Sequence, residues 1–515
     1  MCDAHSEVQE EQRRFDRLQQ QLAEQFEQVF PDMQVPRTIV VVPSLSLNAT
    51  ELLKISGVHH YEERMLCLLM LLRMPRTRVV YVTSLPIAPT IIDYYLHLLP
   101  GIPTSHARQR LTTLSCYDSS HVPLTKKILE RPRLLQRIRN ELAGCQYGHM
   151  TCFNATSLER TLALALNLPL YATDPALAHL GTKSGSREVF RAAGVATPDG
   201  YENLRDDTDL AAALAALKQR HPTLRNAVVK LNDGFSGEGN ALFSYAGCPS
   251  GADCPAWVEQ VLPERLRFEA GSETWNDYRR KFAEMGGIVE VFLEGADKRS
   301  PSAQCRIDPL GRAGAISTHD QVLGGPSGQV FLGCTFPADE AYRLAIQEAG
   351  MRAADVLRQR GVLGRVGVDF ISVPRAHGGW DHYGIEINLR KGGTTHPFLM
   401  LQFLIDGRYD PASGCYYTPA GQPRYYYASD NLQDEAYKGL APEDLIDIAV
   451  YHDLHFHGAT QQGVVFHLIG ALSEFGKLGV LCIGDSAERA RTLYSHTVEV
   501  LNKETMRDAT YRPSR

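Results

Sequence analysis

The sequence predicts an α/β protein of several domains, because apolar strand-like runs alternate with segments of helical spacing in three parts of the chain. These parts are residues 38–83, 183–231 and 463–501. Strands that alternate with helices at this spacing are typical of α/β units. The chain has 515 residues, which is long enough for three or four structural units. We therefore expect a multi-domain protein with room for an active site between its domains.

An amphipathic helix is predicted for the first 30 residues, which are rich in Glu, Gln and Arg. Its apolar side chains recur at helical spacing, and they are Phe15, Leu18, Leu22, Phe26 and Val29. Pro31 and Pro36 end the helix. We expect residues 1–36 to form a helical arm, which packs either on the body of the protein or on a second subunit in a homodimer.

An α/β domain is predicted next, for residues 37–175. Its first strand, Thr38–Val42, is apolar throughout, which fits a sheet that is covered on both faces. A helix is expected at Tyr61–Arg73 and a second buried strand at Arg78–Thr83. A strand, a helix and a strand in this order predict one α/β domain.

A second block covers residues 176–400 and opens with helices at 183–193 and 208–219. Residues 246–286 show little periodicity and are interpreted as an insertion. A helix is expected at 339–358. The strands expected in this block are Ala227–Leu231, Ile288–Leu293, Gly314–Thr318, Gly367–Ser372 and His382–Asn388.

The last block, residues 401–515, is predicted to be a small α/β domain. It opens with an irregular stretch rich in tyrosine, Cys415–Tyr427. Strands at Gly463–Leu468 and Gly479–Ile483 follow, and a helix across 486–501 closes the block.

Composition and charge exclude several classes of function. The net charge of −6 and the pI near 6.3 give no overall basic field for nucleic acid. The longest apolar run, Met65–Leu72, is far shorter than the roughly 20 residues that cross a bilayer. The N-terminus has neither a basic start nor an apolar core, so we expect a cytoplasmic protein without an export signal. The 11 cysteines are scattered and are expected to be reduced thiols.

The first candidate site is the segment 230–240, which follows a predicted strand. Lys230 precedes a loop that contains Gly234, Ser236, Gly237 and Gly239. Glycines let backbone N–H groups approach phosphate oxygens and the lysine supplies charge, so the segment fits a polyphosphate clamp. Neither common nucleotide fingerprint matches it. The alternative interpretation is a flexible hairpin loop.

The second candidate site lies at the end of the strand His382–Asn388. Alternation points Glu386, Asn388 and Arg390 to one face of this strand. Two oxygen donors beside a cation suit Mg²⁺ that bridges phosphates. Asp369, in an otherwise apolar strand, adds a carboxylate whose burial needs a metal or a partner. The alternative is a solvated polar face on an edge strand.

Lys183 and Arg187 form the third candidate, at the start of a helix that ends in the turn Gly194–Pro198. Residues four apart share a helix face, as they would also do on a surface helix. The order and spacing of the three candidates resemble the ATP-grasp superfamily. There, a lysine opens a helix that ends in such a turn, and a second lysine precedes a glycine-rich flap. A hinge strand, an acidic strand and a Glu-x-Asn sequence follow.

This resemblance implies roles for individual residues. Lys183 and Lys230 would bind ATP, with Asp233–Asn240 as the flap. In the hinge, Glu290 would accept a hydrogen bond from the adenine amino group, Val291 and Leu293 would pair with the ring through their backbones, and Asp297 would bind the ribose. The implied Mg²⁺ ligands are Asp369, Glu386 and Asn388. 

The superfamily pattern allows more than one arginine at the reacting centre. Arg390 matches an arginine that several members place over this centre, which makes Arg390 and Lys230 the implied catalytic residues. Some ligases of the superfamily carry an arginine two residues before the acidic ligand, where this chain has Gly367. Arg365 and Arg306 are therefore alternatives to Arg390.

A narrower resemblance covers most of the chain. It is to the pheganomycin-type peptide ligases, which have an α/β pre-ATP-grasp domain, an ATP-grasp core of two α+β lobes and a C-terminal domain of their own. The matching strings are Val42–Leu45, His60–Arg64, Tyr81–Ser84, Ser317–Gln321, Gly333–Pro337 and Asn388–Pro397. The N-terminal helix and residues 246–286 fall outside this match.

The family resemblance implies an ATP- and Mg²⁺-dependent ligase that activates a carboxylate as an acylphosphate and joins it to an amine. The implied substrates are an amino acid or a derivative and an amine or peptide acceptor, with no nucleic-acid or membrane partner. The loop from Gly393 through Thr394 and Thr395 to His396 would hold the acceptor carboxylate. 

His319, Asp320 and Gln321 would contact phosphate or orient the amine, while a structural hydrogen-bonding role for His319 stays open. Two alternatives to a ligase also stay open at this point. One is a kinase that phosphorylates a small-molecule hydroxyl, and the other is a catalytically silent nucleotide-binding protein.

Overall fold

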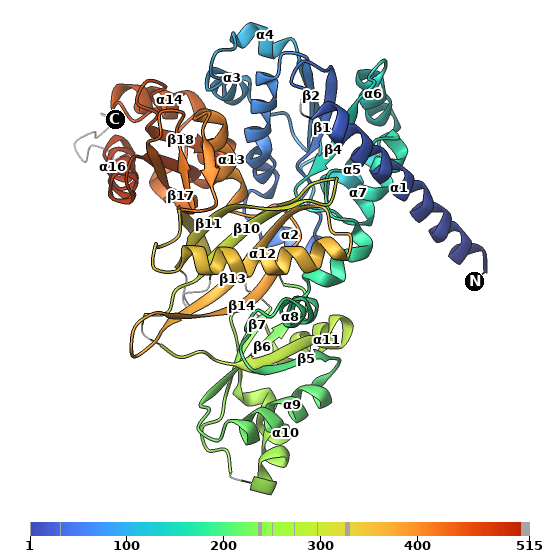
Figure 1. Ribbon diagram of the computed structural model, residues 1–515, viewed down its shortest axis with the longest axis vertical. Coiled ribbons are helices and arrows are strands. Elements are labelled where there is room, and N and C mark those ends of the chain that lie inside the picture. The colour runs from blue at the N-terminus through green and yellow to red at the C-terminus, as the bar shows by residue number, and fades with distance from the viewer. Residues whose placement is uncertain are drawn as a thin grey trace, which may run out of the picture.

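Three β-sheets organise the chain in this computed structural model (Figure 1). The structure describes residues 2–30, 32–234, 239–249, 251–271, 273–295, 297–324 and 330–505. No helix within these ranges is long and apolar enough to cross a membrane. The mixture of parallel and antiparallel sheets with helices between them confirms the predicted α/β class with α+β lobes.

The first sheet is parallel throughout and has the strand order β3-β2-β1-β4. Its strands are β1 (Arg37–Val42), β2 (Thr77–Thr83), β3 (Leu111–Ser115) and β4 (Gly148–Cys152). In β1 every residue is buried, and successive side chains enter two different apolar clusters on opposite faces of the sheet. The continuous apolar strand predicted from the sequence therefore has both faces covered.

Helices surround this first sheet. They are α2 (Ala49–Leu53), η1 (Val58–Arg73), α3 (Pro89–His97), α4 (Thr104–Arg108), α5 (Leu124–Leu129), α6 (Pro132–Leu142), α7 (Ser157–Leu166) and η2 (Pro175–Gly181). The predicted helix at 61–73 is a 3-10 helix of 16 residues, η1. Side chains three residues apart lie above one another in a 3-10 helix, so η1 presents different faces from those of an α-helix.

The N-terminal helix α1 (Cys2–Val29) packs on the same chain. Its five predicted apolar residues are all buried, and Phe15 belongs to the cluster on one face of the first sheet. Gln12 adds a hydrogen bond from its Nε2 to Asp174 Oδ2 at 2.9 Å. The expected amphipathic helix is confirmed, and its apolar face is used within the chain; the homodimer stays a prediction.

The second sheet is antiparallel, with the order β5-β9-β6-β7-β8, and forms the lower end of the molecule in Figure 1. Its strands are β5 (Gly200–Leu204), β6 (Asn226–Leu231), β7 (Asn240–Ser244), β8 (Leu266–Phe268) and β9 (Gly287–Val291). The helices of this lobe are α8 (Lys183–Ala192), α9 (Asp207–Arg220), α10 (Cys254–Arg265) and α11 (Trp275–Met285), with a short turn η3 (Gly251–Asp253). 

The stretch 246–286, interpreted as an insertion, thus supplies two helices and an edge strand. Pro263 lies inside α10, and proline is rare inside helices. This accounts for the weak helical pattern in the sequence.

The third sheet follows the path β14-β13-β10-β11-β12-β17-β16-β15, with β19 beside β17 and β18 beside β19. Its strands before residue 400 are β10 (Pro301–Ile307), β11 (Ala313–Gly324), β12 (Val330–Phe336), β13 (Gly364–Pro374) and β14 (Trp380–Asn388). Those after it are β15 (Arg408–Asp410), β16 (Cys415–Tyr417), β17 (Pro423–Gln433), β18 (Gly463–His467) and β19 (Lys477–Gly484). The sheet runs across the predicted boundary at residue 400 through the pairing of β12 with β17, and the domain limits stay predictions.

Helices cover this large sheet on both sides of that boundary. They are α12 (Arg343–Gln359), α13 (Thr395–Leu404), α14 (Pro442–Tyr451), α15 (Leu472–Phe475) and α16 (Ala487–Thr505), with short turns η4 (Glu435–Tyr437) and η5 (Ile469–Ala471). In Figure 1, α12 crosses the front of the sheet, and the N-terminal and C-terminal elements both lie at its upper side. The three metal-ligand candidates, on β13 and β14, therefore lie between the lobe of the second sheet below and the rest of the chain above.

Candidate active site

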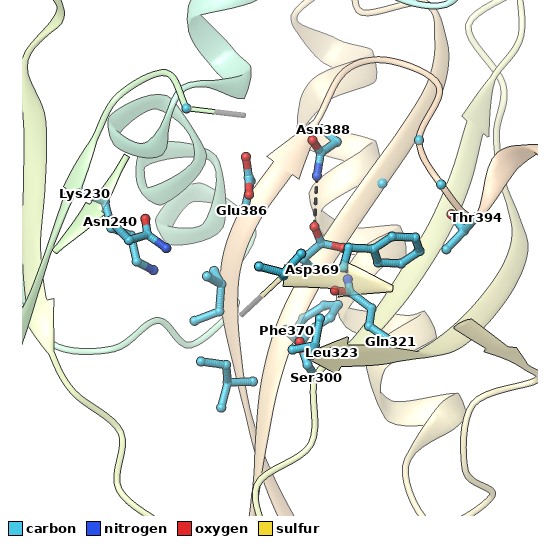
Figure 2. Close-up of a pocket in the computed structure, with 18 of the residues that line it drawn as sticks. Lys230, Asn240, Ser300, Gln321, Leu323, Asp369, Phe370, Glu386, Asn388 and Thr394 are labelled. Carbon is cyan, nitrogen blue, oxygen red and sulfur yellow. Dashed lines mark hydrogen bonds between the residues drawn. The ribbon is translucent and has the colours of Figure 1, made fainter. Parts of the chain in front are cut away.

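A cavity of about 910 Å³ is lined by residues of the second and third sheets and by residues of η1 and α2 beside the first sheet. A volume of this size is at the upper end of small-molecule sites. Figure 2 shows Lys230 and Asn240 on one side of it, Glu386 in the middle, and Asp369, Asn388 and Gln321 on the other side. The cavity therefore joins the first and second candidate sites in one space.

The metal-ligand candidates are neighbours on adjacent antiparallel strands. Asp369 on β13 is opposite Glu386 on β14. Asn388 Nδ2 donates to Asp369 Oδ2 at 2.9 Å, which Figure 2 marks, and Gln321 Nε2 donates to Asp369 Oδ1 at 3.0 Å. Strand pairing thus brings together the three oxygen-bearing side chains that the sequence placed on one face.

The pKa values of the two carboxylates in this group are shifted in opposite directions from their ordinary values. Burial, together with the charge of Glu386, raises the pKa of Asp369 to about 7. Burial also acts to raise the pKa of Glu386, but the charges of Lys183 and Arg390 outweigh it, so that this pKa is lowered. Lys183 Nζ lies 2.5 Å from Glu386 Oε1. Two buried acids with an amide oxygen beside them fit a hard divalent cation, which would stabilise both as carboxylates.

Lys183 and Arg187 open α8 and point to different partners. While Lys183 pairs with Glu386, Arg187 donates from its NH1 to Glu290 Oε2 at 3.4 Å and from its Nε to Glu202 Oε2 at 3.1 Å. The helix therefore supplies cations to two acids that line the cavity, Glu386 and Glu290. Both partners line the same cavity, which is consistent with the expectation that Lys183 and Arg187 share one face of the helix.

The nucleotide side also contains a buried ion pair between Lys230 and Glu290. Lys230, on β6, donates to Glu290 Oε1 on the neighbouring strand β9, and both residues are almost fully buried. Both oxygens of Glu290 thus face cations, Lys230 and Arg187. In this structure Glu290 is the counter-ion of Lys230. An adenine amino group, the expected donor to Glu290, would have to share its oxygens with these two cations.

The other nucleotide candidates are placed unevenly. Gly234, Val291 and Leu293 line the cavity, although the Val291 N–H already donates to Asp199 O at 2.8 Å. Gly239 is buried beside the cavity lining, and Asp297 is exposed and does not line it. Ser236, Gly237 and most of the expected flap lie outside the described residues.

The substrate candidates divide into those that line the cavity and those behind its wall. Gln321, Gly393 and Thr394 line it. The candidates behind the wall are His319, Asp320, Thr395 and His396.

His319 and Asp320 have partners within the protein. His319 is fully buried with its Nε2 at 2.7 Å from Tyr426 Oη, which favours the structural alternative for this residue. Asp320 accepts from Tyr342 Oη at 2.6 Å and from the Asp339 N–H at 2.8 Å. His319 and Tyr426 lie on β11 and β17, while the partners of Asp320 lie just before α12, and the sequence pattern could not place these segments side by side.

Of the three arginines considered for the reacting centre, Arg390 lines the cavity. It lines the space next to Asp369 and Glu386, whose charges raise its pKa against the larger lowering effect of burial. Its NH1 donates to Lys391 O at 3.2 Å. Neither alternative, Arg365 or Arg306, lines this cavity.

Sequence reasoning missed a set of charged and aromatic residues at the other end of the cavity. These are Tyr61, Arg64, Phe153, Asp430 and Lys477. They come from the N-terminal and C-terminal parts of the chain, and the 60–64 string was used only to support a resemblance. A single lysine at the start of an apolar strand, as at Lys477, gave no signal of its own.

Family comparisons agree with this geometry. The family model described as "IQCH-like, ATP-grasp" matches residues 175–260 and 251–410, and the model "PGM1 C-terminal domain" matches residues 444–497. The L-propargylglycine–L-glutamate ligase of Streptantibioticus cattleyicolor is 32% identical over 448 residues, which cover 85% of this chain and 88% of that protein.

Solved structures share the fold at low sequence identity. The biotin carboxylase of Campylobacter jejuni, in complex with β,γ-ATP, has a TM-score of 0.53 and 13% identity, and the match covers 92% of this chain and 96% of that one. The biotin carboxylase domain of the Hydrogenobacter thermophilus 2-oxoglutarate carboxylase, in complex with MgADP, ADP and bicarbonate, has a TM-score of 0.53 and 12% identity, covering 90% and 89%. The chain belongs to the pheganomycin-type peptide ligases of the ATP-grasp superfamily, enzymes that form amide bonds at the expense of ATP.

Proposed function

We propose that this ligase uses Mg²⁺ and ATP to join a carboxylate of one amino acid to the amine of another through an acylphosphate. The observation that carries the proposal is a single cavity whose lining contains two acids, one amide and the cation Arg390, with further space beyond them. Lys183 pairs with one of these acids, Glu386. The ligase relative, whose name specifies two amino acids, supports amino-acid substrates.

The charges at the nucleotide side support phosphate binding. Lys183 and Lys230 are buried cations, and each is held by one carboxylate, Glu386 and Glu290 respectively. Because a lysine ammonium has three donors, each can keep its carboxylate and still bind a phosphate oxygen. The pairings hold both ammonium groups in place before ATP arrives, which reduces the reorganisation that binding requires.

The residues Asp369, Glu386 and Asn388 would hold the Mg²⁺. A bound Mg²⁺ would neutralise phosphate charge and so let two anions approach each other. Gln321 orients Asp369 through the 3.0 Å hydrogen bond to its Oδ1. The other oxygen, Oδ2, accepts from Asn388 Nδ2 at 2.9 Å and keeps a second lone pair that could bind the shared metal ion.

Arg390 would place the reacting carboxylate in line with the γ-phosphate. A carboxylate oxygen attacks phosphorus, the bond to the β-γ bridging oxygen breaks, and ADP leaves with that electron pair. The amine nitrogen of the second substrate then attacks the acyl carbon, its proton is lost, and the C–O bond to phosphate breaks. The guanidinium compensates the negative charge that develops in both steps.

The test is a screen for ADP release that depends on two substrates together. L-Glutamate is paired with each of the common L-amino acids and with L-propargylglycine, and amide products are identified by mass. We expect one or more pairs to give ADP and amide in equal amounts, and hydroxylamine to trap an acyl hydroxamate. Phosphate found on a hydroxyl group instead would refute the proposal.

Glu386→Gln tests the metal position. It removes one charge while it keeps the size of the side chain, so turnover should fall at least about 100-fold while the fold is retained. A matched control is Glu348→Gln on α12, an exposed residue paired with Arg352 away from the cavity. Equal effects of the two substitutions would contradict the assignment.

A further inference from the structure

The cavity continues beyond the metal-ligand candidates into an end that none of the nucleotide contacts uses. We call it the distal end, and its residues are Tyr61, Arg64, Phe153, Asp430 and Lys477. They come from η1, from the residue after β4, and from β17 and β19. These segments are far apart in the sequence and also far from the metal-ligand candidates, so tertiary contacts bring them together at the distal end.

Arg64 lies close to two aromatic rings. Its guanidinium carbon lies 4.4 Å from the centre of the Tyr61 ring and 4.9 Å from that of Phe153. Tyr61 and Arg64 are three residues apart in a 3-10 helix, which places their side chains above each other. Arg64 is 8% exposed and its NH1 pairs with Asp430 Oδ2 at 3.2 Å. 

The Arg64 guanidinium keeps unused donors. Its Nε is buried without an acceptor, and its NH2 has no acceptor among the described residues. A guanidinium has five N–H donors in a rigid fork that suits a carboxylate. The side chain is therefore fixed in orientation and is only partly satisfied by the protein.

Lys477 is a second buried cation in the same wall. It is 8% exposed, and its Nζ donates to Tyr61 Oη at 2.7 Å. No carboxylate of the described residues forms an ion pair with it. A buried ammonium that faces only a neutral phenol is unfavourable, and an anionic ligand would remove that cost.

The charge of the distal end is consequently positive. It contains the two cations Arg64 and Lys477 and one acid, Asp430. A further lysine at the cavity, Lys54, is paired with Glu51 at 3.0 Å and is more exposed. Arg64 and Lys477 are both buried, so an anion bound there would interact strongly with the two cations.

We propose that the distal end binds a free carboxylate of an amino-acid substrate, namely a carboxylate that is not phosphorylated in the reaction. This inference rests on the proposed function, because it assigns part of the same cavity to a substrate. Lys477 and Arg64 bind the carboxylate, and Tyr61 positions both cations. A substrate in which that carboxylate is replaced by a carboxamide leaves the two cations without an anion and is rejected.

The first experiment measures binding without turnover. Calorimetry with saturating ADP and Mg²⁺ compares L-glutamate with its two monoamides, L-glutamine and L-isoglutamine. It also compares L-propargylglycine, and each amino acid that ligates in the screen above, with its carboxamide. We expect one free acid to bind at least about 100-fold more tightly than its amide. The arm in which this occurs tells which substrate supplies the carboxylate.

The variants Lys477→Met and Arg64→Gln identify the groups responsible. Each should weaken binding of the free acid by about 30-fold or more and that of the amide by less than about 3-fold. Lys477→Arg keeps the charge and should retain most of the preference. The matched control, Lys54→Met, removes the same charge from an ion-paired lysine at the same cavity and should change the preference less than about 3-fold.

Three results would overturn the inference. They are equal binding of acids and amides, absence of binding by any of these amino acids, and a preference that survives both Lys477→Met and Arg64→Gln. If the acid preference is present and depends on Lys477 while no amide product forms with any pair, the distal end is confirmed and the ligase proposal fails instead. The outcomes therefore distinguish failure of the carboxylate-binding inference from failure of the proposed ligase reaction.

Discussion

Removal of the Lys230–Glu290 ion pair should destabilise the nucleotide lobe in a strongly non-additive way. The two side chains are 7% and 4% exposed, so neither charge is screened by solvent. Loss of one partner from a buried pair costs about 3–5 kcal/mol. Because Arg187 still faces Glu290 at 3.4 Å, we expect Lys230→Met to lie at the lower end, about 3 kcal/mol. Glu290→Gln leaves two buried cations and should cost about 4 kcal/mol.

The double variant Lys230→Met/Glu290→Gln should therefore cost less than the sum of the single changes. A coupling energy of about 2 kcal/mol is expected for residues in direct contact. The protein has three tryptophans, of which Trp257 and Trp275 pack against the core of the five-stranded sheet. In a Trp380→Phe background, fluorescence during urea unfolding reports that lobe alone. 

ADP binding by the wild type, the two single variants and the double variant tests whether the same pair serves nucleotide binding. ADP affinity should fall with Lys230→Met and should not be restored in the double variant, because the phosphate contact is lost in both. A coupling energy below about 0.5 kcal/mol would show that the two charges do not depend on each other. That result would refute the pairing on which the nucleotide side is built.

Three further predictions concern residues outside the cavity wall. Burial raises the pKa of Glu62 from 4.5 to about 7, so the folded state binds a proton that the unfolded chain has lost, and stability should fall by up to about 3 kcal/mol as the pH rises through this window. Glu62→Gln should flatten that decline in urea unfolding, and an unchanged slope would contradict it. Tyr426→Phe removes the partner of His319 Nε2 and should cost about 1–3 kcal/mol, with KM values within about 2-fold in steady-state assays; a larger KM change would return His319 to the substrate site. Gly333→Ala would place a Cβ 2.1 Å from the Ala428 carbonyl oxygen, so thermal unfolding should show a loss of about 1–3 kcal/mol, and an unchanged Tm would refute this close approach of β12 and β17.

The part of the site that the sequence predicted depends on local geometry. Alternation along one strand fixed Glu386 and Asn388 on the same face, and the apolar surroundings of Asp369 marked it as a carboxylate that needs a partner. Pairing of β13 with β14 then places these three side chains together. Lys183 was predicted from its position at a helix start, and its contact with Glu386 adds only one tertiary step.

The distal end could not be predicted, because its contacts join distant parts of the chain. Lys477 and Tyr61 are 416 residues apart, and Arg64 and Asp430 are 366 residues apart. No periodicity links such positions. The 3-10 form of η1 was also hidden, since its apolar sequence is equally consistent with an α-helix. In the 3-10 form the side chains of Tyr61 and Arg64 lie above each other.

The two halves of the cavity therefore differ in how they are built, and this has a functional consequence. The half assigned to nucleotide and metal uses side chains of paired strands, whose relative positions are set by backbone hydrogen bonds. The half assigned to substrate depends on η1, which Glu63 fixes to the C-terminal part by accepting the Gly470 N–H at 3.0 Å. 

A change in the packing of η1 would then move Tyr61 and Arg64 together while it leaves the strand pairs in place. Glu63→Gln should accordingly alter the preference for free acid over carboxamide more than it alters ADP affinity, because it weakens a contact of η1 and none of the nucleotide side. The neighbouring substitution Glu62→Gln, which acts on the Ser84 contacts of the same helix, provides the comparison. If ADP affinity and acid preference fell by the same factor in both variants, the two halves of the cavity would be mechanically coupled and would not respond independently to η1.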